Sequence, residues 1–470
     1  MRRLRSFFLL LLLVGGAARA DDVDPTDPAD PADPGIADVQ PDFDPLRGID
    51  PDGRIPAILR PPDLPNPERW RYIPEGRLKP GNVFQRFLVS SMIAPYAFYD
   101  SDIGMGFGVA LVDIDFREQR RREFAGAFLS YTTEGQQNYT FIWRRWLHHI
   151  ELPGGGVLQE ERSLIRAEGG YSRSLTRRFF GLGPDTNESD ETSYRDSVGF
   201  IELGVDHTWP DPGDNLVLSL GVSGEWHDLG NGHVGGKPDT SEVFPELFDE
   251  ADPSALGTLR AGIRWDTRDS QVNPYRGWFV SGDVDAALLQ ENGDVGAVWG
   301  VGSGYFLPVP SLIYDVPSLL QGVPEPSEAA EENAPTDVLA FGLTTEFTSG
   351  DLPFFALPSL GGSRDLRGFI AGRWRDRSSW EMTLEYRFWL LPRGFPIPFT
   401  DRIRVERFGA ALFYETGAVA RNGVRLFESP VRFSYGIGIR ASLERAAPFR
   451  VDVGFSKEGV NVSAGFGLGF

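Results

Sequence analysis

The stretch Gly361-Gly-Ser-Arg-Asp-Leu-Arg-Gly-Phe369 lies late in the chain, between two segments in which apolar and polar residues alternate. Glycine allows backbone conformations that other residues rarely adopt, and charged side chains are seldom buried unless they are paired. A simple surface turn does not need both features together. We therefore expect a long loop that folds back into the interior of a β-barrel, with Arg367 at its tip.

Residues 461–470 show the alternation of the surrounding segments most clearly. Val462, Ala464, Phe466, Leu468 and Phe470 alternate with asparagine, serine and glycine, and residues 215–225 and 434–443 repeat the pattern. A period of two indicates a β-strand with one apolar and one polar face. A soluble sandwich would bury the apolar face, whereas a membrane barrel turns it to lipid and lines its lumen with the polar face.

Three features favour the membrane barrel. The segments are about ten residues long, as tilted strands that cross a bilayer must be. Their polar faces are rich in charge and glycine, and aromatic residues gather near their ends, as interfacial girdles do. The predicted fold is all-β, a 16-stranded antiparallel transmembrane β-barrel with an inward-folded loop between strands 11 and 12. The predicted strands are residues 91–99, 104–116, 122–132, 137–147, 162–174, 193–209, 215–228, 256–267, 277–289, 296–307, 337–348, 379–391, 403–417, 431–443, 448–456 and 461–470.

The first 20 residues have the pattern of a signal peptide. Arginines precede the apolar run Phe7–Val14, and Ala18-Arg-Ala20 forms a cleavage site. Residues 21–83 are rich in Asp and Pro and are predicted to be a disordered periplasmic tail, because they offer little apolar surface to bury. The barrel is then predicted to span residues 84–470. With an even number of strands, both of its ends lie on the periplasmic side of a bacterial outer membrane.

Composition excludes several classes of function. The chain has no cysteine, so it forms neither disulfides nor thiolate metal sites. A formal net charge of −21 argues against nucleic acid, which requires a basic surface. The residues show no nucleophile–base–acid set, no metal-ligand spacing and no cofactor motif. We therefore predict no enzymatic activity, no metal and no cofactor, and a monomer in the outer membrane.

Several motifs resemble one family. The stretch Asp266-Thr-Arg-Asp-Ser-Gln-Val-Asn-Pro-Tyr-Arg-Gly-Trp278 is similar to a signature turn of the bacterial surface-antigen barrel, in the BamA/TamA-like outer-membrane assembly superfamily. Leu366-Arg367-Gly368-Phe369 resembles the tip of that family's inward loop. Phe413-Tyr-Glu-Thr-Gly417 is similar to its Phe-x-Asp-x-Gly strand, with Glu415 in place of Asp. Phe470 matches the C-terminal aromatic residue that such barrels use as an assembly signal.

This resemblance covers about residues 84–470 and implies a 16-stranded barrel with the arginine-bearing loop between strands 11 and 12. One departure affects the expected role. Members of the family usually carry periplasmic POTRA domains before the barrel, whereas residues 21–83 show no helix–strand periodicity. The chain therefore resembles a barrel-only member that lacks POTRA domains.

Arg367 is the leading candidate for a site residue. In the twelfth predicted strand, Glu385 shares the polar face with Glu381 and Thr383 and so points to the lumen. The family resemblance implies that Glu415 also points inward. We predict that Glu415 and Glu385 clamp Arg367, because a guanidinium fork matches carboxylate geometry.

The closure between the first and last strands is a second candidate. Pro95 cannot donate to a strand ladder and belongs at an edge. Gly465, Gly467 and Gly469 occupy the polar face of the last strand, where small residues weaken pairing and register. These residues suggest a labile barrel seam. Alternatively, the glycines make room for the inward loop or allow the strand to curve.

The leading functional hypothesis is a barrel that assists the insertion or translocation of polypeptides at the outer membrane. Its partners would be outer-membrane lipid and client outer-membrane or secreted polypeptides. Alternatives are a passive pore or structural barrel whose lumen the loop plugs, and a surface receptor that uses the segment Asp228–Ala255.

Overall fold

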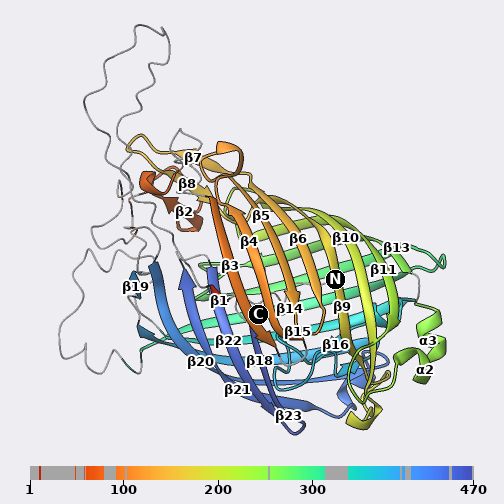
Figure 1. Ribbon diagram of the computed structural model, residues 1–470. Coiled ribbons are helices and arrows are strands. Elements are labelled where there is room, and N and C mark those ends of the chain that lie inside the picture. The colour runs from red at the N-terminus through yellow and green to blue at the C-terminus, as the bar shows by residue number, and fades with distance from the viewer. Residues whose placement is uncertain are drawn as a thin grey trace, which may run out of the picture.

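The computed structural model describes residues 60–78, 91–100, 103–251, 254–311, 337–391, 394–396, 404–443 and 447–467, together with the isolated positions 10, 11, 48, 55, 58 and 313. One antiparallel sheet contains the long strands and curls into a barrel (Figure 1). Sixteen strands form its wall, as the sequence predicted. They are β3 (Ser91–Asp100), β4 (Gly104–Asp113), β5 (Glu123–Thr132), β6 (Gln137–Trp146), β9 (Leu164–Phe179), β10 (Thr192–Trp209), β11 (Leu216–Asn231), β12 (Ser254–Asp266), β13 (Gly277–Gln290), β14 (Gly296–Val309), β15 (Asp337–Gly350), β18 (Ser378–Leu391), β20 (Arg404–Ala420), β21 (Arg432–Leu443), β22 (Ala447–Ser456) and β23 (Gly459–Phe466).

The apolar faces of these strands point outward. In β11, the side chains of Leu218, Leu220 and Val222 are 41%, 54% and 52% exposed. In β21, Ile437 and Ile439 are each 48% exposed. A soluble sandwich would have buried these residues, so the exposed apolar belt confirms the predicted membrane barrel.

The barrel closes between its first and last strands. β23 lies next to β3 in the sheet order, and Ala464 of β23 packs against the cluster of Tyr96, Phe98 and Ala110. On its other side, β23 is matched to β22 from Phe449–Phe466 to Ser456–Gly459. The two-residue strand β1 (Leu10–Leu11) pairs with β3 at Ala97 and Tyr96.

The two ends of the barrel differ, and we name them by their connections. The distal end carries residues 180–191, 232–251 and 351–377. There, α2 (Thr240–Val243), α3 (Pro245–Asp249) and the 3-10 helix η6 (Phe354–Ala356) pack over the strand ends. The buried side chains of this distal cluster are Phe179, Tyr194, Leu229, Phe248, Ala251, Leu256, Phe354 and Phe355.

The proximal end carries the connections 114–122, 147–163, 210–215 and 267–276. A small sheet lies at this end, opposite α2 and α3 (Figure 1). It is ordered β2 (Trp70–Ile73), β8 (Val157–Glu160), β7 (His149–Glu151). The 3-10 helices η2 (Pro67–Arg69) and η3 (Glu75–Arg77) flank β2. We call residues 60–78 with 147–163 the proximal cap.

The cap corrects part of the sequence analysis. Residues 21–83 were predicted to be disordered, yet 60–78 are folded. Trp70 and Tyr72 pack with Leu158, and Ile73 and Leu78 pack with Val157. The apolar partners lie on a hairpin about 85 residues further along the chain, so local composition did not reveal them.

The remaining elements are short. They are β16 (Ser359–Leu360), β17 (Trp374–Arg375), β19 (Phe395–Pro396), and the 3-10 helices η4 (Phe116–Glu118), η5 (Glu188–Asp190) and η7 (Arg425–Phe427). No helix in the described part of the chain is long and apolar enough to cross a membrane. Gly469 and Phe470 lie outside the described residues, as does most of the predicted signal peptide and tail.

Candidate functional site

The predicted loop lies between β15 and β18, the eleventh and twelfth strands of the wall. Its stem is a two-residue ladder in which Ser359 faces Arg375 and Leu360 faces Trp374. Gly361 and Gly362 have φ angles of +103° and +134°, which glycine adopts without strain. The glycines therefore let the chain turn sharply as it leaves the ladder.

At the loop's tip, Arg367 is fully buried and contacts three carboxylates. Its Nε donates to Glu415 at 2.5 Å. Its Nη1 donates to Glu385 and to Asp452, each at 3.0 Å. The structure thus brings Arg367 together with both residues that the sequence pointed to, on β20 and β18, and adds Asp452 on β22. Asp452 was missed because no local motif marks it.

Two of the three carboxylates, Glu385 and Asp452, also bind arginines from the barrel wall. Arg387 donates to Glu385 at 2.7 Å, and Arg450 donates to Asp452 at 2.5 Å. Arg440 bridges Glu385 at 2.9 Å and Asp452 at 2.6 Å. Four arginines and three carboxylates therefore form one buried cluster across β18, β20, β21, β22 and the loop. Each carboxylate is 0% exposed, so removing an arginine would leave buried carboxylates with less compensating charge.

The loop backbone lies directly against the last strands. A Cβ atom added to Gly368 would come within 2.5 Å of the carbonyl oxygen of Phe455, and one added to Gly454 would come within 2.5 Å of the carbonyl oxygen of Arg367. Asn461 of β23 donates to the carbonyl oxygens of Arg367 and Phe369, each at 3.2 Å. The loop thus contacts both β22 and β23.

The loop is also fastened at the distal end. Arg373 donates to Glu458, in the turn between β22 and β23, at 2.7 Å, and to Thr186, in the connection after β9, at 3.1 Å. Arg375 donates to the carbonyl oxygen of Phe354 in the distal cluster at 2.8 Å. The loop therefore joins two parts of the distal rim that are far apart in sequence.

A cavity of about 820 Å³ lies beside the loop. Residues Gly361–Asp365 form part of its lining, and Asn138, Asp283 and Glu381 contribute from separate strands of the wall. A space of this size and polarity can hold water, ions or an extended polar segment. No group of three or more metal-ligating side chains occurs within the described residues.

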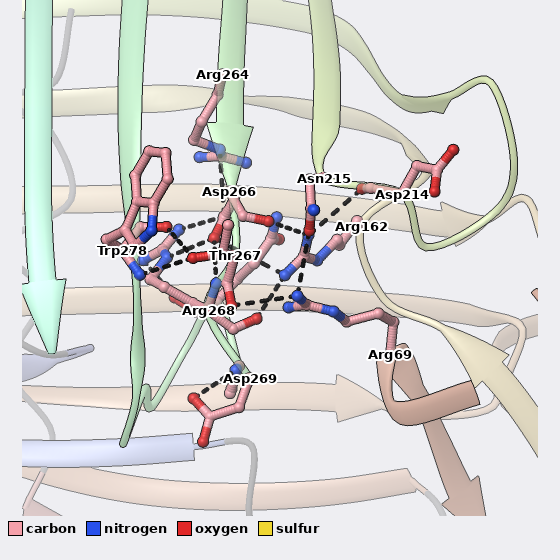
Figure 2. Close-up of polar contacts among 12 residues, drawn as sticks. Arg69, Arg162, Asp214, Asn215, Arg264, Asp266, Thr267, Arg268, Asp269 and Trp278 are labelled. Atoms are coloured by element: carbon pink, nitrogen blue, oxygen red, sulfur yellow. Dashed lines mark hydrogen bonds and ion pairs between the residues drawn. The ribbon is translucent and has the colours of Figure 1, made fainter. Parts of the chain in front are cut away.

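The signature turn connects β12 to β13 at the proximal end (Figure 2). Arg268 donates twice to Asp266, through Nε at 3.0 Å and Nη2 at 2.7 Å. The carboxylate of Asp269 accepts the backbone N–H groups of Ser270, Tyr275 and Arg276 at 3.0 to 3.3 Å. Burial raises the pKa of Asp269, and these three hydrogen bonds oppose the rise. The motif therefore holds its own ten-residue turn in one shape.

The cap binds this turn through two arginines (Figure 2). Arg162 donates to the carbonyl oxygens of Asp266 at 2.7 Å and Arg268 at 2.6 Å. Arg69 donates to the carbonyl oxygen of Thr267 at 3.1 Å. Sequence reasoning missed both arginines, because their acceptors are backbone groups that leave no signal in the sequence.

The predicted seam residues occupy different settings. Pro95 is exposed in β3, opposite Val109. Gly465 is buried in β23, opposite Arg450. Gly467 follows β23 with a φ of +81° and donates its N–H to the carbonyl oxygen of Pro448. Their role in seam lability stays a prediction, as does the assembly role of Phe470.

The profile of the Omp85 superfamily domain matches residues 171–470, more than half of the chain. The chain belongs to the Omp85 superfamily. It is a transmembrane β-barrel of the bacterial outer membrane, which is the setting expected from the exposed apolar belt. The matched part of this Omp85 barrel contains the loop, its carboxylate partners and the signature turn. Comparison with curated protein sequences gives no match.

Solved structures similar to this Omp85 chain share little sequence with it. BamA from Haemophilus ducreyi lacking POTRA domains 1-3 is 13% identical, over 81% of this chain and 70% of that one, with a TM-score of 0.47. CdiB from Escherichia coli is 11% identical, over 80% and 61%, with a TM-score of 0.49. CdiB from Acinetobacter baumannii is 10% identical, over 85% and 65%, with a TM-score of 0.44. The chain thus spans less than two thirds of either CdiB chain.

Proposed function

We propose that this Omp85 barrel assists the insertion or translocation of polypeptides at the outer membrane, without enzymatic chemistry. The observation that carries the proposal is the contact between the loop and the last strand. Arg367 is anchored in the buried cluster, and its carbonyl oxygen accepts from Asn461 of β23. The loop can therefore control both the lumen and the strand at which the barrel closes.

The seam supports the same proposal. β22 and β23 are matched over eight residue pairs, and β23 meets β3 at the closure of the wall. Pro95 of β3 has no backbone N–H, and local opening costs less free energy where fewer backbone hydrogen bonds can form. In this proposal the proximal end faces the periplasm, the loop is folded inward, and a monomeric barrel receives client polypeptides.

The cavity favours a second candidate, a passive pore. A space of about 820 Å³, with Asn138, Asp283 and Glu381 in its lining, could carry water and small solutes. In that case the loop would restrict the lumen, and the seam would remain closed.

Reconstitution separates the two candidates. The mature barrel is placed in liposomes, and a small outer-membrane barrel is diluted from urea as the client. Folding of the client is followed by its heat-modifiable mobility, and ion conductance is measured in parallel. Faster client folding than in empty liposomes supports the insertion role. Conductance without faster folding supports the pore.

Two variants sharpen this experiment. Asn461→Ala removes the side chain that binds the loop to β23 and should change the rate of client folding. Arg421→Gln removes an exposed charge in the connection after β20 and should leave that rate unchanged. An equal change in both variants would contradict the role assigned to the loop.

A further inference from the structure

The turn between β4 and β5 combines backbone strain with clustered arginines. Arg117, Glu118, Arg120 and Arg121 have φ angles of +56°, +62°, +52° and +65°. Non-glycine residues rarely adopt this left-handed conformation, and such strain gathers at functional sites. In the described part of the chain, only Asn66 and Leu366 share it among non-glycine residues. The turn therefore holds its side chains in an arrangement that a relaxed turn would not give.

One of these arginines reaches the outer face of the barrel. Arg117 donates to Glu123 through Nε at 2.7 Å and through Nη2 at 2.6 Å. Arg145 of β6, which faces Glu123 across the strand pair, donates to the same carboxylate. The three residues form an arginine–glutamate–arginine triad at the proximal edge of β5 and β6.

The triad belongs to the lipid-facing side of the wall. Glu123 has the same strand parity as Leu129 and Tyr131, which are 40% and 53% exposed. Arg145 has the same parity as Tyr139 and Phe141, which are 42% and 50% exposed. These apolar and aromatic residues make up the belt that meets lipid, so the triad lies where that belt ends and the headgroup region begins.

The exposed part of the triad is cationic. The side chain of Glu123 is 0% exposed, whereas those of Arg117 and Arg145 are 57% and 30% exposed. A group that approaches the triad therefore meets guanidinium N–H donors, while the carboxylate of Glu123 is covered. The guanidinium of Arg117 also lies 5.9 Å from the ring centre of Trp143, an aromatic residue of the kind that sits at headgroup level. A guanidinium group can donate two parallel N–H hydrogen bonds to the oxygens of one phosphate.

We propose that Arg117 and Arg145 form a binding site for the phosphate of an anionic phospholipid headgroup, with Glu123 holding the two guanidinium groups in place. The site lies at the proximal edge of β5 and β6, and β5 is two strands from β3 at the barrel closure. An ordered lipid there would fix the membrane edge beside the closing strands. The inference rests on the proposed function for one point only, the choice of leaflet. The proposed function places the proximal end at the periplasm, so the bound lipid belongs to the inner leaflet of the outer membrane.

The test measures lipid retention, which does not depend on any insertion activity. The purified mature barrel in detergent is incubated with phosphatidylglycerol or phosphatidylcholine, and retained lipid is counted by native mass spectrometry. The wild-type barrel should retain more phosphatidylglycerol than phosphatidylcholine. A basic residue near a membrane surface contributes about fivefold to binding of anionic lipid, so Arg117→Gln should weaken retention about fivefold and the double change with Arg145→Gln about 25-fold.

Arg276→Gln is the matched control, since it removes an exposed arginine at the same end of the barrel. Heat-modifiable mobility checks that each variant is folded. Because Arg117 is mostly exposed, its single variant keeps the test valid if the double variant fails to fold. The proposal is overturned if the Arg117 variant retains phosphatidylglycerol as the wild type does, or if Arg276→Gln loses as much. Equal retention of phosphatidylcholine, or full displacement by inorganic phosphate, also overturns it.

Discussion

Arg367 donates to both carboxylate oxygens of Glu415, through its side-chain Nε at 2.5 Å and its backbone N–H at 2.6 Å. Both residues are fully buried. Glu415 therefore fixes the path of the loop as well as the guanidinium. A third donor, the hydroxyl of Ser434, holds the same carboxylate at 2.8 Å.

Replacing Arg367 should destabilise the barrel strongly. Arg367→Gln leaves Glu385, Glu415 and Asp452 with less compensating charge, and breaking a buried ion pair costs about 3–5 kcal/mol. Arg367→Lys should not restore the loss, because one ammonium group cannot reproduce the geometry of the guanidinium fork. Urea unfolding in detergent, followed by tryptophan fluorescence, measures both variants.

The control for this prediction is Arg421→Gln, whose exposed side chain should change stability by no more than about 0.5 kcal/mol. A lysine variant as stable as the wild type would show that charge alone, without the directed hydrogen bonds of the guanidinium, holds the loop.

Two glycines should be intolerant of a single methyl group. A Cβ on Gly454 would lie 2.5 Å from backbone atoms of Arg367, and one on Gly368 would lie 2.5 Å from the carbonyl oxygen of Phe455. Since both neighbours are backbone atoms, the loop itself must move. Each alanine variant should lose about 1–3 kcal/mol, as overpacked sites do, and should become more sensitive to protease between residues 361 and 373. A Cβ on Gly282 would have no atom within 4 Å, so Gly282→Ala should behave as the wild type.

The wall of the barrel could be predicted from the sequence because its signal is local. Period-two alternation and strand length place each strand, and strand parity alone puts Glu385 on the lumen face with Thr383. The resemblance of Leu366–Phe369 and Glu415 to family motifs then supplied the pairing with Arg367. Each step used neighbouring residues or a short motif.

The rest depended on contacts between distant segments. Asp452 joins the cluster from 85 residues away, and nothing around it distinguishes it from other polar strand residues. The four residues of β2 are too few to show a period, and their apolar partners Val157 and Leu158 lie on another hairpin. Arg162 binds backbone carbonyls, which are present at every position. Such contacts become visible only once the strands are assembled.

Arg162 should anchor the cap to the rim. Arg162→Gln leaves the carbonyl oxygens of Asp266 and Arg268 without their buried donor, and an unsatisfied buried group costs about 1–3 kcal/mol. We expect faster hydrogen exchange across residues 61–78, measured by mass spectrometry, with little change in β14. Arg71→Gln removes a partly exposed ion pair with Glu161 and should leave the exchange nearly unchanged. Unchanged exchange in the Arg162 variant would mean that apolar packing alone holds the cap.

Asn461 should determine how firmly the last strand is held. Its side-chain amide donates to two loop carbonyls, so Asn461→Ala removes both contacts without touching the ladder to β22. If the seam is labile, amide hydrogens of residues 459–466 should exchange faster than those of β14 in the wild type, and faster still in the variant. Ser463→Ala is the matched control, because its hydroxyl is buried in the same strand and has no hydrogen-bond partner among the described residues.

The exchange rates of β23 in the wild type and in Asn461→Ala distinguish two explanations of the glycine-rich last strand. A seam held by the loop predicts that exchange rises in the Asn461 variant across β23 and the adjoining edge of β3, because both face the closure. Glycines that serve only to make room for the loop predict slow exchange in β23 before and after the change, since its ladder to β22 is complete from Phe449 to Ser456. Exchange in β23 as slow as in β14, in both proteins, would rule out a labile seam and leave the passive pore as the better account of this barrel.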